Sequence, residues 1–238
     1  MKNYTLLLLF VLTTILSVNA QSPAWQWVQT DTALNISSGI GLRKEVSAAS
    51  GTQVLWATMN KVNYSVNPYP YGDVKLTVFS QQGVKQADTF ITGKVSIVDI
   101  KSDNFGNWYL LGAYYDSLQY GSFSKINTTA NGPFYFVARL DVGTLALKWF
   151  TPIGVDYNTQ AASLFFRDHY LYVPTDSALS NIIYKIETGT GTQTTVVRQA
   201  QAGYVNSVVA DDGGNIYVAG SCPGFSIDTF GNQPITIN

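Results

Sequence analysis

The sequence predicts an all-β protein built from repeated, short antiparallel strands, and three observations lead to that fold class. Apolar residues make up 46% of the 238 residues and aromatic residues 13%, which is enough to bury a sizeable core. The 20 glycines are typical of strands joined by tight turns. A ten-residue pattern, D-x-x-G-N-x-Y-x-x-G, occurs at 103–112 and again at 211–220, and no segment after residue 20 shows helical periodicity.

The first 20 residues have the pattern of a secretory signal peptide. Lys2 is followed by an apolar run at 6–16 and by small residues before the expected cleavage site. A membrane span is the competing interpretation, but it needs about 20 apolar residues, and polar residues interrupt this run earlier. We therefore expect 1–20 to be removed, no transmembrane segment to remain, and 21–238 to be secreted, periplasmic or attached to the cell surface.

The ten-residue pattern belongs to a longer repeat. Weaker copies place Leu55 and Tyr172 in register with Tyr109 and Tyr217, so that these positions are separated by 54, 63 and 45 residues. Uneven spacing is expected where loops vary in length and strands do not. The second unit contains four strand-like segments in order, "KVSIVDIKSD", "NWYLLG", "FYFVARLD" and "LALKWF". Repeats are predicted at 43–92, 93–152, 155–199 and 202–238, the last of them incomplete.

The D-x-x-G-N part of the pattern predicts a hairpin turn. The aspartate would cap nearby backbone N–H groups, the glycine and asparagine would accept positive φ, and the tyrosine would resume the strand. A calcium site is the alternative, but "DDGGN" does not have the spacing of an EF-hand loop, so no metal is expected. The predicted turn residues are Asp103, Gly106, Asn107, Asp211, Gly214 and Asn215.

Four-stranded repeats of this length are the signature of β-propeller blades. The order D-x-x-G-N-x-Y-x-x-G, then "FVARLD" with Gly143, then Trp149, resembles the bacterial secreted β-propeller repeat often called the SBBP repeat. The resemblance spans most of the chain after residue 20 but is strong only in the second and fourth units, because "KLTVFSQQG" and "YKIETG" replace the middle motif elsewhere. It implies an exported β-propeller scaffold, and it transfers no catalytic residue and no cofactor.

The two ends of the chain bear on whether the ring of blades is complete. "AWQWVQTD" at 24–31 resembles "ALKWFTPIG" at 146–154, which predicts a strand of the kind that closes a ring. After 226–238 no "FVARLD"-like strand follows. The alternatives are a fragment of a longer propeller and an open array, and we expect the fragment because open blade edges invite strand pairing.

Composition limits the partners of the chain. A net charge of −1 with 12% charged residues gives no basic patch, so no nucleic-acid partner is expected. Cys222 is the single cysteine, which excludes an intrachain disulfide and a cysteine zinc site. Two long predicted loops, 58–71 and 113–133, carry tyrosines that would stack on a carbohydrate or anchor a protein, unless they only cover blade surfaces. These candidate binding residues are Tyr69, Tyr71, Tyr114 and Tyr115.

An enzyme is the alternative function. His169 is the single histidine and falls near a predicted turn, so a catalytic triad is not expected. Glu45 and Asp99 fall in register on predicted innermost strands, and a glycosidase needs two carboxyl groups about 5 to 10 Å apart. A solvated channel wall would also accommodate these acids. We predict a non-catalytic scaffold that binds a protein or carbohydrate, with a glycan-active enzyme, a glycosidase or lyase using channel carboxylates, as the alternative.

Overall fold

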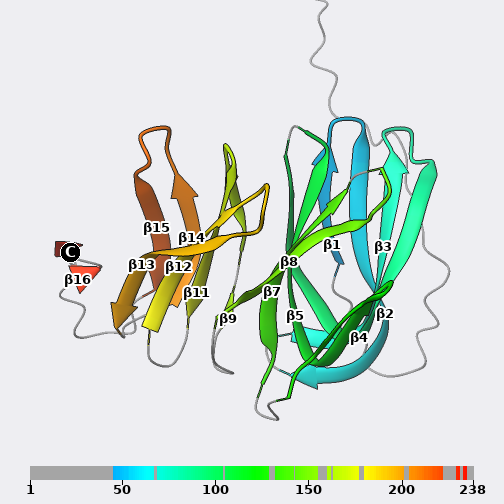
Figure 1. Ribbon diagram of the computed structural model, residues 1–238, viewed down its shortest axis with the longest axis horizontal. Coiled ribbons are helices and arrows are strands. Elements are labelled where there is room, and N and C mark those ends of the chain that lie inside the picture. Colours follow the sequence, from blue (N-terminus) through cyan, green and yellow to red (C-terminus); the bar gives the residue numbers. More distant parts are fainter. Residues whose placement is uncertain are drawn as a thin grey trace, which may run out of the picture. The chain divides into compact units, whose positions relative to one another are not determined.

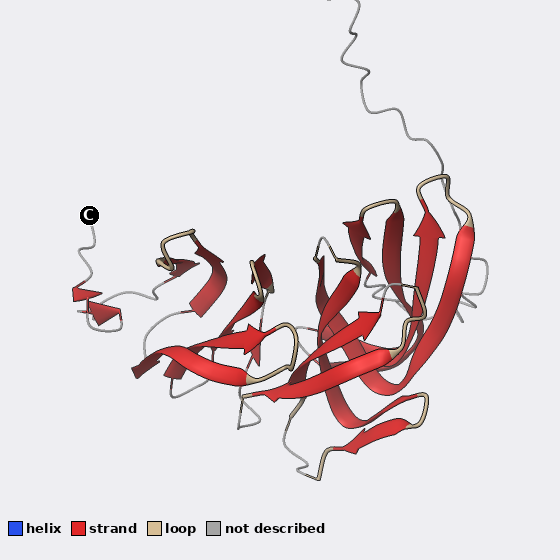
Figure 2. Cartoon of the chain, turned by 45° about the horizontal axis from the view of Figure 1, so that its top comes forward, coloured by secondary structure: helices blue, strands red, loops and turns tan. Residues whose placement is uncertain are grey.

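In the part of the chain that it describes, the computed structural model is built of β-strands joined by turns and loops (Figures 1 and 2). The all-β prediction is confirmed, and no helix among these residues is long and apolar enough to cross a membrane. The predicted signal peptide, the predicted strand at 24–31 and Cys222 lie outside the described residues. Described are 45–66, 69–103, 105–128, 132–141, 143–154, 160–161, 163–176, 180–200, 204–221, 229–230 and 233–234.

The first sheet has eight antiparallel strands in the order β1-β2-β3-β4-β5-β7-β8, with β6 paired to β5. It is coloured blue to green in Figure 1 and curls strongly. Its strands are β1 (Glu45–Ser50), β2 (Gln53–Val66), β3 (Tyr69–Ser80), β4 (Lys85–Ser102), β5 (Asn107–Tyr120), β6 (Phe123–Ile126), β7 (Phe134–Asp141) and β8 (Leu147–Ile153).

Three smaller sheets follow in the described residues. The second sheet has the order β10-β11-β12-β13, with β9 paired to β11, and the other two are the hairpins β14-β15 and β16-β17. Their strands are β9 (Gln160–Ala161), β10 (Phe165–Arg167), β11 (Tyr170–Asp176), β12 (Ser180–Glu187), β13 (Gln193–Ala200), β14 (Tyr204–Ala210), β15 (Ile216–Ser221), β16 (Thr229–Phe230) and β17 (Gln233–Pro234).

Strand β4 runs without a break through the boundary predicted between 92 and 93. Its first half pairs with β3 and its second half with β5, so the first two predicted repeats share one sheet. Gly93, where the partner changes, has φ +122° and donates its N–H to Asp73 Oδ1 at 2.9 Å. A Cβ here would lie 2.2 Å from the carbonyl oxygen of Ser117, so the close approach of β4 and β5 requires glycine.

Three apolar clusters connect successive sheets or halves of sheets. Strand side chains alternate between two faces, so each sheet contributes one set of residues to one cluster and the alternate set to the next. The first cluster contains Leu55, Leu76, Trp108, Leu110 and Phe136; the second Tyr109, Leu111, Val137, Leu171 and Val173; the third Tyr172, Ile183, Val208 and Ala210. Each buried large side chain contributes about 1.5–3 kcal/mol of burial free energy.

Two of the four residues aligned in the sequence repeat, Tyr109 and Tyr172, hold equivalent buried positions, whereas Tyr217 is exposed. Tyr109 of β5 pairs across the ladder with Arg139 of β7, and Tyr172 of β11 pairs with Lys185 of β12. Both tyrosines are buried against the sheet that follows in the chain. The spacing of the sequence pattern therefore corresponds to a repeated packing position.

Candidate functional site

The turn between β4 and β5 is organised around the carboxylate of Asp103. One oxygen, Oδ1, accepts the backbone N–H groups of Phe105 and Asn107, both at 2.9 Å. The other, Oδ2, accepts the Asn107 side-chain amide at 2.8 Å and the Tyr109 hydroxyl at 2.7 Å. Asp103 is only 5% exposed, and four donors satisfy its two oxygens. The sequence places an aspartate here because the turn leaves these donors converging on one point.

The turn between β14 and β15 repeats this network. Asp211 accepts the N–H and the side-chain amide of Asn215, each at 2.8 Å, and the hydroxyl of Tyr217 at 3.0 Å. Asn215 and Tyr217 are exposed, whereas the equivalent donors of the first turn are partly or fully buried. The two copies of the pattern therefore form the same side-chain bonds, but those of the second copy are more exposed to solvent.

The predicted positive φ is found for the glycines of these turns but not for the asparagines. Gly106 and Gly214 have φ values of 84° and 80°. Among the described non-glycine residues only Leu145 and Asp168 have positive φ, so that part of the prediction was wrong for Asn107 and Asn215. Both asparagines stabilise the turn through hydrogen bonds from their side-chain amides. The sequence pattern alone does not show whether an asparagine acts through its side chain or through its backbone conformation.

Hydrogen bonding explains the acidity of the turn carboxylates. Burial opposes ionisation of Asp103, but the donors on Asn107, Tyr109 and Phe105 outweigh it and hold its pKa below the ordinary 3.8. The bonds from Asn215 likewise lower the pKa of Asp211. Burial and the bond to Asp103 raise the pKa of Tyr109. These carboxylates are committed to their own turns, and the described residues contain no group of three or more His, Cys, Asp or Glu side chains that would hold a metal ion.

Neighbouring turns contact one another. The hydroxyl of Ser50 donates to the carbonyl of Asp103 at 3.2 Å, which joins the β1–β2 turn to the β4–β5 turn. The Phe105 ring stacks with the His169 ring of the β10–β11 turn, with centroids 6.4 Å apart and 20° between the planes. Arg167 forms an ion pair with Asp212 of the β14–β15 turn. Four turns, β1–β2, β4–β5, β10–β11 and β14–β15, are thus linked in the order in which they occur in the chain.

Arg139 and Trp149 bridge the first and second sheets, a role that the sequence motif did not reveal. The Arg139 guanidinium donates to Asn107 Oδ1 at 2.9 and 3.1 Å and to the carbonyl of Thr188 at 3.0 Å. The indole N–H of Trp149 donates to the same carbonyl at 2.9 Å. The sequence did show a basic residue that recurs in "ARLDVG" and "YKIETG". That Arg139 bridges two sheets is apparent only from the structure.

His169 lies in the exposed two-residue turn between β10 and β11, as the sequence predicted. Its carbonyl accepts the N–H of Thr188 at 2.9 Å and the Thr188 hydroxyl at 3.0 Å. Asp168, the other turn residue, has φ +53°, a conformation that aspartate tolerates better than most side chains. The backbone of this turn is fixed by its neighbour while its two side chains remain exposed.

Three of the four candidate binding tyrosines are buried or partly buried. Tyr71 and Tyr114 are 1% and 6% exposed and belong to the apolar clusters, so neither offers a free ring face to a ligand. Tyr115 is partly buried, makes an edge contact with Tyr71 at 6.2 Å, and has the Lys94 ammonium 5.6 Å from its ring centroid. The side chain of Tyr69 lies outside the described residues.

The predicted loops that carried these tyrosines are largely strand. Strand β2 extends to Val66 and β3 begins at Tyr69, while β5 continues to Tyr120 and turns directly into β6. The prediction of two long loops was therefore wrong in these segments. Proline and glycine in "NPYPYG" indicated a loop, but cross-strand pairing extends almost to the tip of the hairpin.

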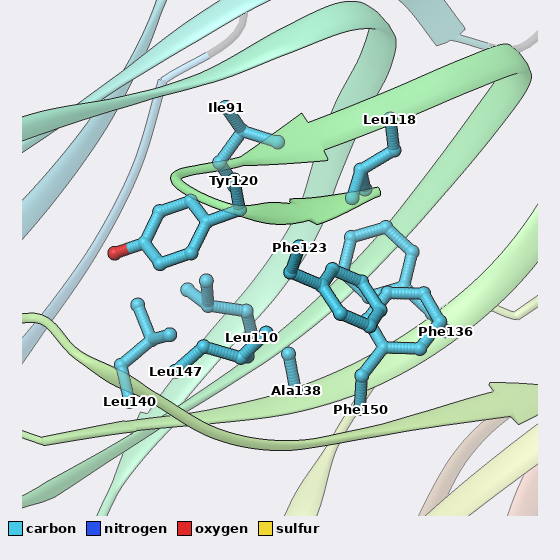
Figure 3. Close-up of a pocket in the computed structure, with 10 residues that line it drawn as sticks. All are labelled: Ile91, Leu110, Leu118, Tyr120, Phe123, Phe136, Ala138, Leu140, Leu147 and Phe150. Carbon is cyan, nitrogen blue, oxygen red and sulfur yellow. The ribbon is translucent and has the colours of Figure 1, made fainter. Parts of the chain in front are cut away.

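A small apolar hollow lies where the β5–β6 hairpin folds over the first sheet (Figure 3). The rings of Phe123 and Phe136 both pack against Phe150, at 4.9 and 4.8 Å, while Tyr120 lines the other side and donates its hydroxyl to the carbonyl of Leu145. Burial raises the pKa of Tyr120 to about 12. The hollow has a volume of about 10 Å³, room for roughly one water molecule, whereas ligand pockets usually measure about 300–1,000 Å³. It is a packing gap beneath the hairpin.

Asp99, the candidate channel acid, is engaged in structural bonds. Its Oδ2 accepts the N–H of Leu164 at 2.8 Å, and its Oδ1 accepts the N–H of Ile100 at 2.8 Å and the Lys101 ammonium at 3.1 Å. The side chain of Glu45 lies outside the described residues. Asp99 therefore ties β4 to the segment that precedes β10.

The strands and their pairing define the class of this protein, an all-β chain of packed antiparallel sheets. No family model matches the sequence, and no curated protein matches it. Among solved structures, the chain is similar to the β-propeller domain of Nup133 from Vanderwaltozyma polyspora, with 10% identity and a TM-score of 0.32. The match covers 75% of this chain and 52% of that one, so this chain spans about half the length of the domain it matches.

Proposed function

We propose that the chain is an exported, non-catalytic β-propeller scaffold that binds a protein or a glycan. Apolar clusters that join the first sheet to the second and the second to the β14–β15 hairpin, with Tyr109 and Tyr172 in equivalent packing positions, support the propeller architecture. The sequence of 1–20 supports export, and the resemblance to the secreted repeat supports a scaffold role.

One observation carries the choice of scaffold over enzyme. Asp99, one of the two candidate channel acids, is occupied by protein donors that tie β4 to the segment before β10, and Asp103 and Asp211 hold turns. A general acid or nucleophile must reach substrate, and these oxygens instead satisfy backbone and side-chain groups. The same bonds make the turns rigid, which suits the display of a binding surface.

The test is to screen the exported full chain against an oligosaccharide array and a phage-displayed library of random peptides. We expect saturable binding to members of at least one set, with the bound molecules recovered chemically unchanged. Cleavage of an array glycan would instead support the glycan-active enzyme, provided that Asp99→Asn abolishes the cleavage. The control is Asp88→Asn, which changes an exposed ion pair with Lys85 and should leave the cleavage intact. Failure to bind either set would contradict the scaffold.

A further inference from the structure

We propose that the exposed rings of Phe105 and His169, together with the carboxylates of Asp168 and Asp212, form a docking surface for a basic segment of a partner protein. We call these four side chains the turn surface. The proposal rests on the proposed scaffold function and identifies its binding face and the chemistry of its partner. It also moves the expected binding face away from the buried tyrosines to the opposite ends of the strands, where the turns lie.

Phe105 is not required by the turn that carries it. The turn bonds come from Asp103, Asn107 and Tyr109, and the Phe105 backbone N–H contributes the only bond from that residue to Asp103. In the matching turn "DDGGN" the equivalent residue is Gly213, and the Asp211 bonds still form. The Phe105 side chain is nevertheless 77% exposed, the largest exposure among the large apolar side chains of the described residues. An exposed large aromatic side chain without a structural duty is a candidate contact residue.

The backbone that carries each ring is held in place before any partner binds. The Phe105 N–H donates to Asp103, and the His169 carbonyl accepts two bonds from Thr188. The rings stack at 6.4 Å across two neighbouring turns. Rigid aromatic side chains lose little conformational entropy on binding, so this arrangement favours affinity.

Two carboxylates of the turn surface face a single cation. The side chains of Asp168 and Asp212 are 69% and 85% exposed, and both carboxylates share one guanidinium, that of Arg167, which is 37% exposed. These three side chains together carry one negative charge in excess, and Asp168 precedes His169 in the same turn. Negative potential beside an aromatic face attracts an arginine or lysine side chain. The chain makes the same kind of contact internally, where the Lys185 ammonium lies 3.8 Å from the Tyr170 ring centroid.

The experiment is a selection of random 12-residue peptides on phage, carried out in parallel on the native full chain and on Phe105→Gly. This variant recreates the glycine found at the equivalent place in the β14–β15 turn, so it is expected to keep the fold; an unchanged urea midpoint checks this. A matched control, Phe90→Ser, removes an aromatic side chain that is 42% exposed elsewhere on the first sheet. Peptides selected by the native chain are expected to be enriched in Arg and Lys and to bind Phe105→Gly at least about 10-fold more weakly, with no change for Phe90→Ser.

A second measurement tests the charge chemistry. The tightest selected peptide is resynthesised with citrulline at each arginine, or acetyl-lysine at each lysine, and is titrated by fluorescence anisotropy. We expect about a 10-fold loss of affinity, and about a 5-fold loss for the original peptide with Asp168→Asn or Asp212→Asn.

Each contrary outcome separates this proposal from the proposed function. Peptides that bind Phe105→Gly as well as the native chain, or that are not enriched in basic residues, would overturn the docking surface and leave the scaffold in place. Neutral oligosaccharides that need Phe105, while no basic peptide does, would replace the basic partner with a glycan. Absence of any binding, to peptides or to glycans, would contradict both proposals.

Discussion

Asp103 illustrates how one buried carboxylate supports a whole turn. Replacing it with alanine leaves the Tyr109 hydroxyl and the Asn107 donors without an acceptor, and Tyr109 is itself buried. We expect Asp103→Ala to lower the free energy of unfolding by about 2–4 kcal/mol, measured by urea denaturation. Asp211→Ala is the matched control, because the same bonds there are exposed, and its loss should be clearly smaller. Equal losses in the two variants would show that burial does not govern this network.

The lowered pKa of Asp103 predicts a pH dependence of stability. A folded-state pKa below the ordinary 3.8 means that the folded state favours the ionised form, so this contribution is fully present above 3.8 and is lost as pH falls through the lowered value. The stability difference between the native chain and Asp103→Ala should therefore be constant near neutral pH and shrink in acid. Urea midpoints measured between pH 2 and 7 check this, and a difference that grows in acid would contradict it.

The pH dependence of stability that Asp176 contributes has the opposite sign to that of Asp103. Burial raises its pKa above 3.8, and the bond that it accepts from the N–H of Val205, at 2.8 Å, only partly offsets the burial. A raised folded-state pKa gives stability that is present in acid and is lost as pH rises through that value. Asp176→Asn keeps an acceptor for Val205 and removes the buried charge. We expect this variant to be at least as stable as the native chain at pH 7 and to lose the advantage at pH 3, as measured by urea midpoints.

Strand β4 depends on Gly93, where it changes pairing partner. An alanine there would combine φ +122° with a Cβ 2.2 Å from the Ser117 carbonyl oxygen, and relief requires β4 and β5 to separate. We expect Gly93→Ala to cost at least about 3 kcal/mol of stability, measured by thermal unfolding. Gly121→Ala is the control, since Gly121 has φ +56° but open space around it, and should cost about 1–2 kcal/mol. A similar melting temperature for both variants would mean that the strands adjust freely.

Strands and turns were predictable from the sequence to the extent that their signals are local. The D-x-x-G-N pattern and the alternation of "FYFVARLD" correspond to a turn and to β7. The extension of β2, β3 and β5 was not predictable, because it depends on pairing between distant segments such as Val95 with Tyr114. For the same reason Tyr71 and Tyr114 appeared available in the sequence and are buried in the structure. The exposure of Phe105 could be inferred only by comparing the two copies of the turn, one of which has Gly213.

Across the molecule, Arg139 provides one of the polar bridges between the first and second sheets. Arg139→Met keeps the aliphatic stem but removes the bonds to Asn107 and to the Thr188 carbonyl. We expect amide hydrogen exchange to accelerate several-fold in β11 and β12, which lie beyond the bridge, while β2 and β3 keep their protection. Lys85→Met, which breaks an exposed ion pair, serves as the control. Uniform acceleration in both regions would indicate that the sheets unfold as one unit.

The neighbour order of the first sheet has a consequence for how the chain acquires its structure. Each strand pairs with the strand that precedes it in the chain, except that β7 pairs with β5 and not with β6. Strand β4 presents its second half to β5 after its first half has paired with β3. A polypeptide that emerges from its amino end can therefore add strands one at a time, each onto an edge already in place. Such short-range closure favours rapid folding. It also means that a chain stopped after β4 would present the unpaired second half of that strand to any other nascent chain nearby.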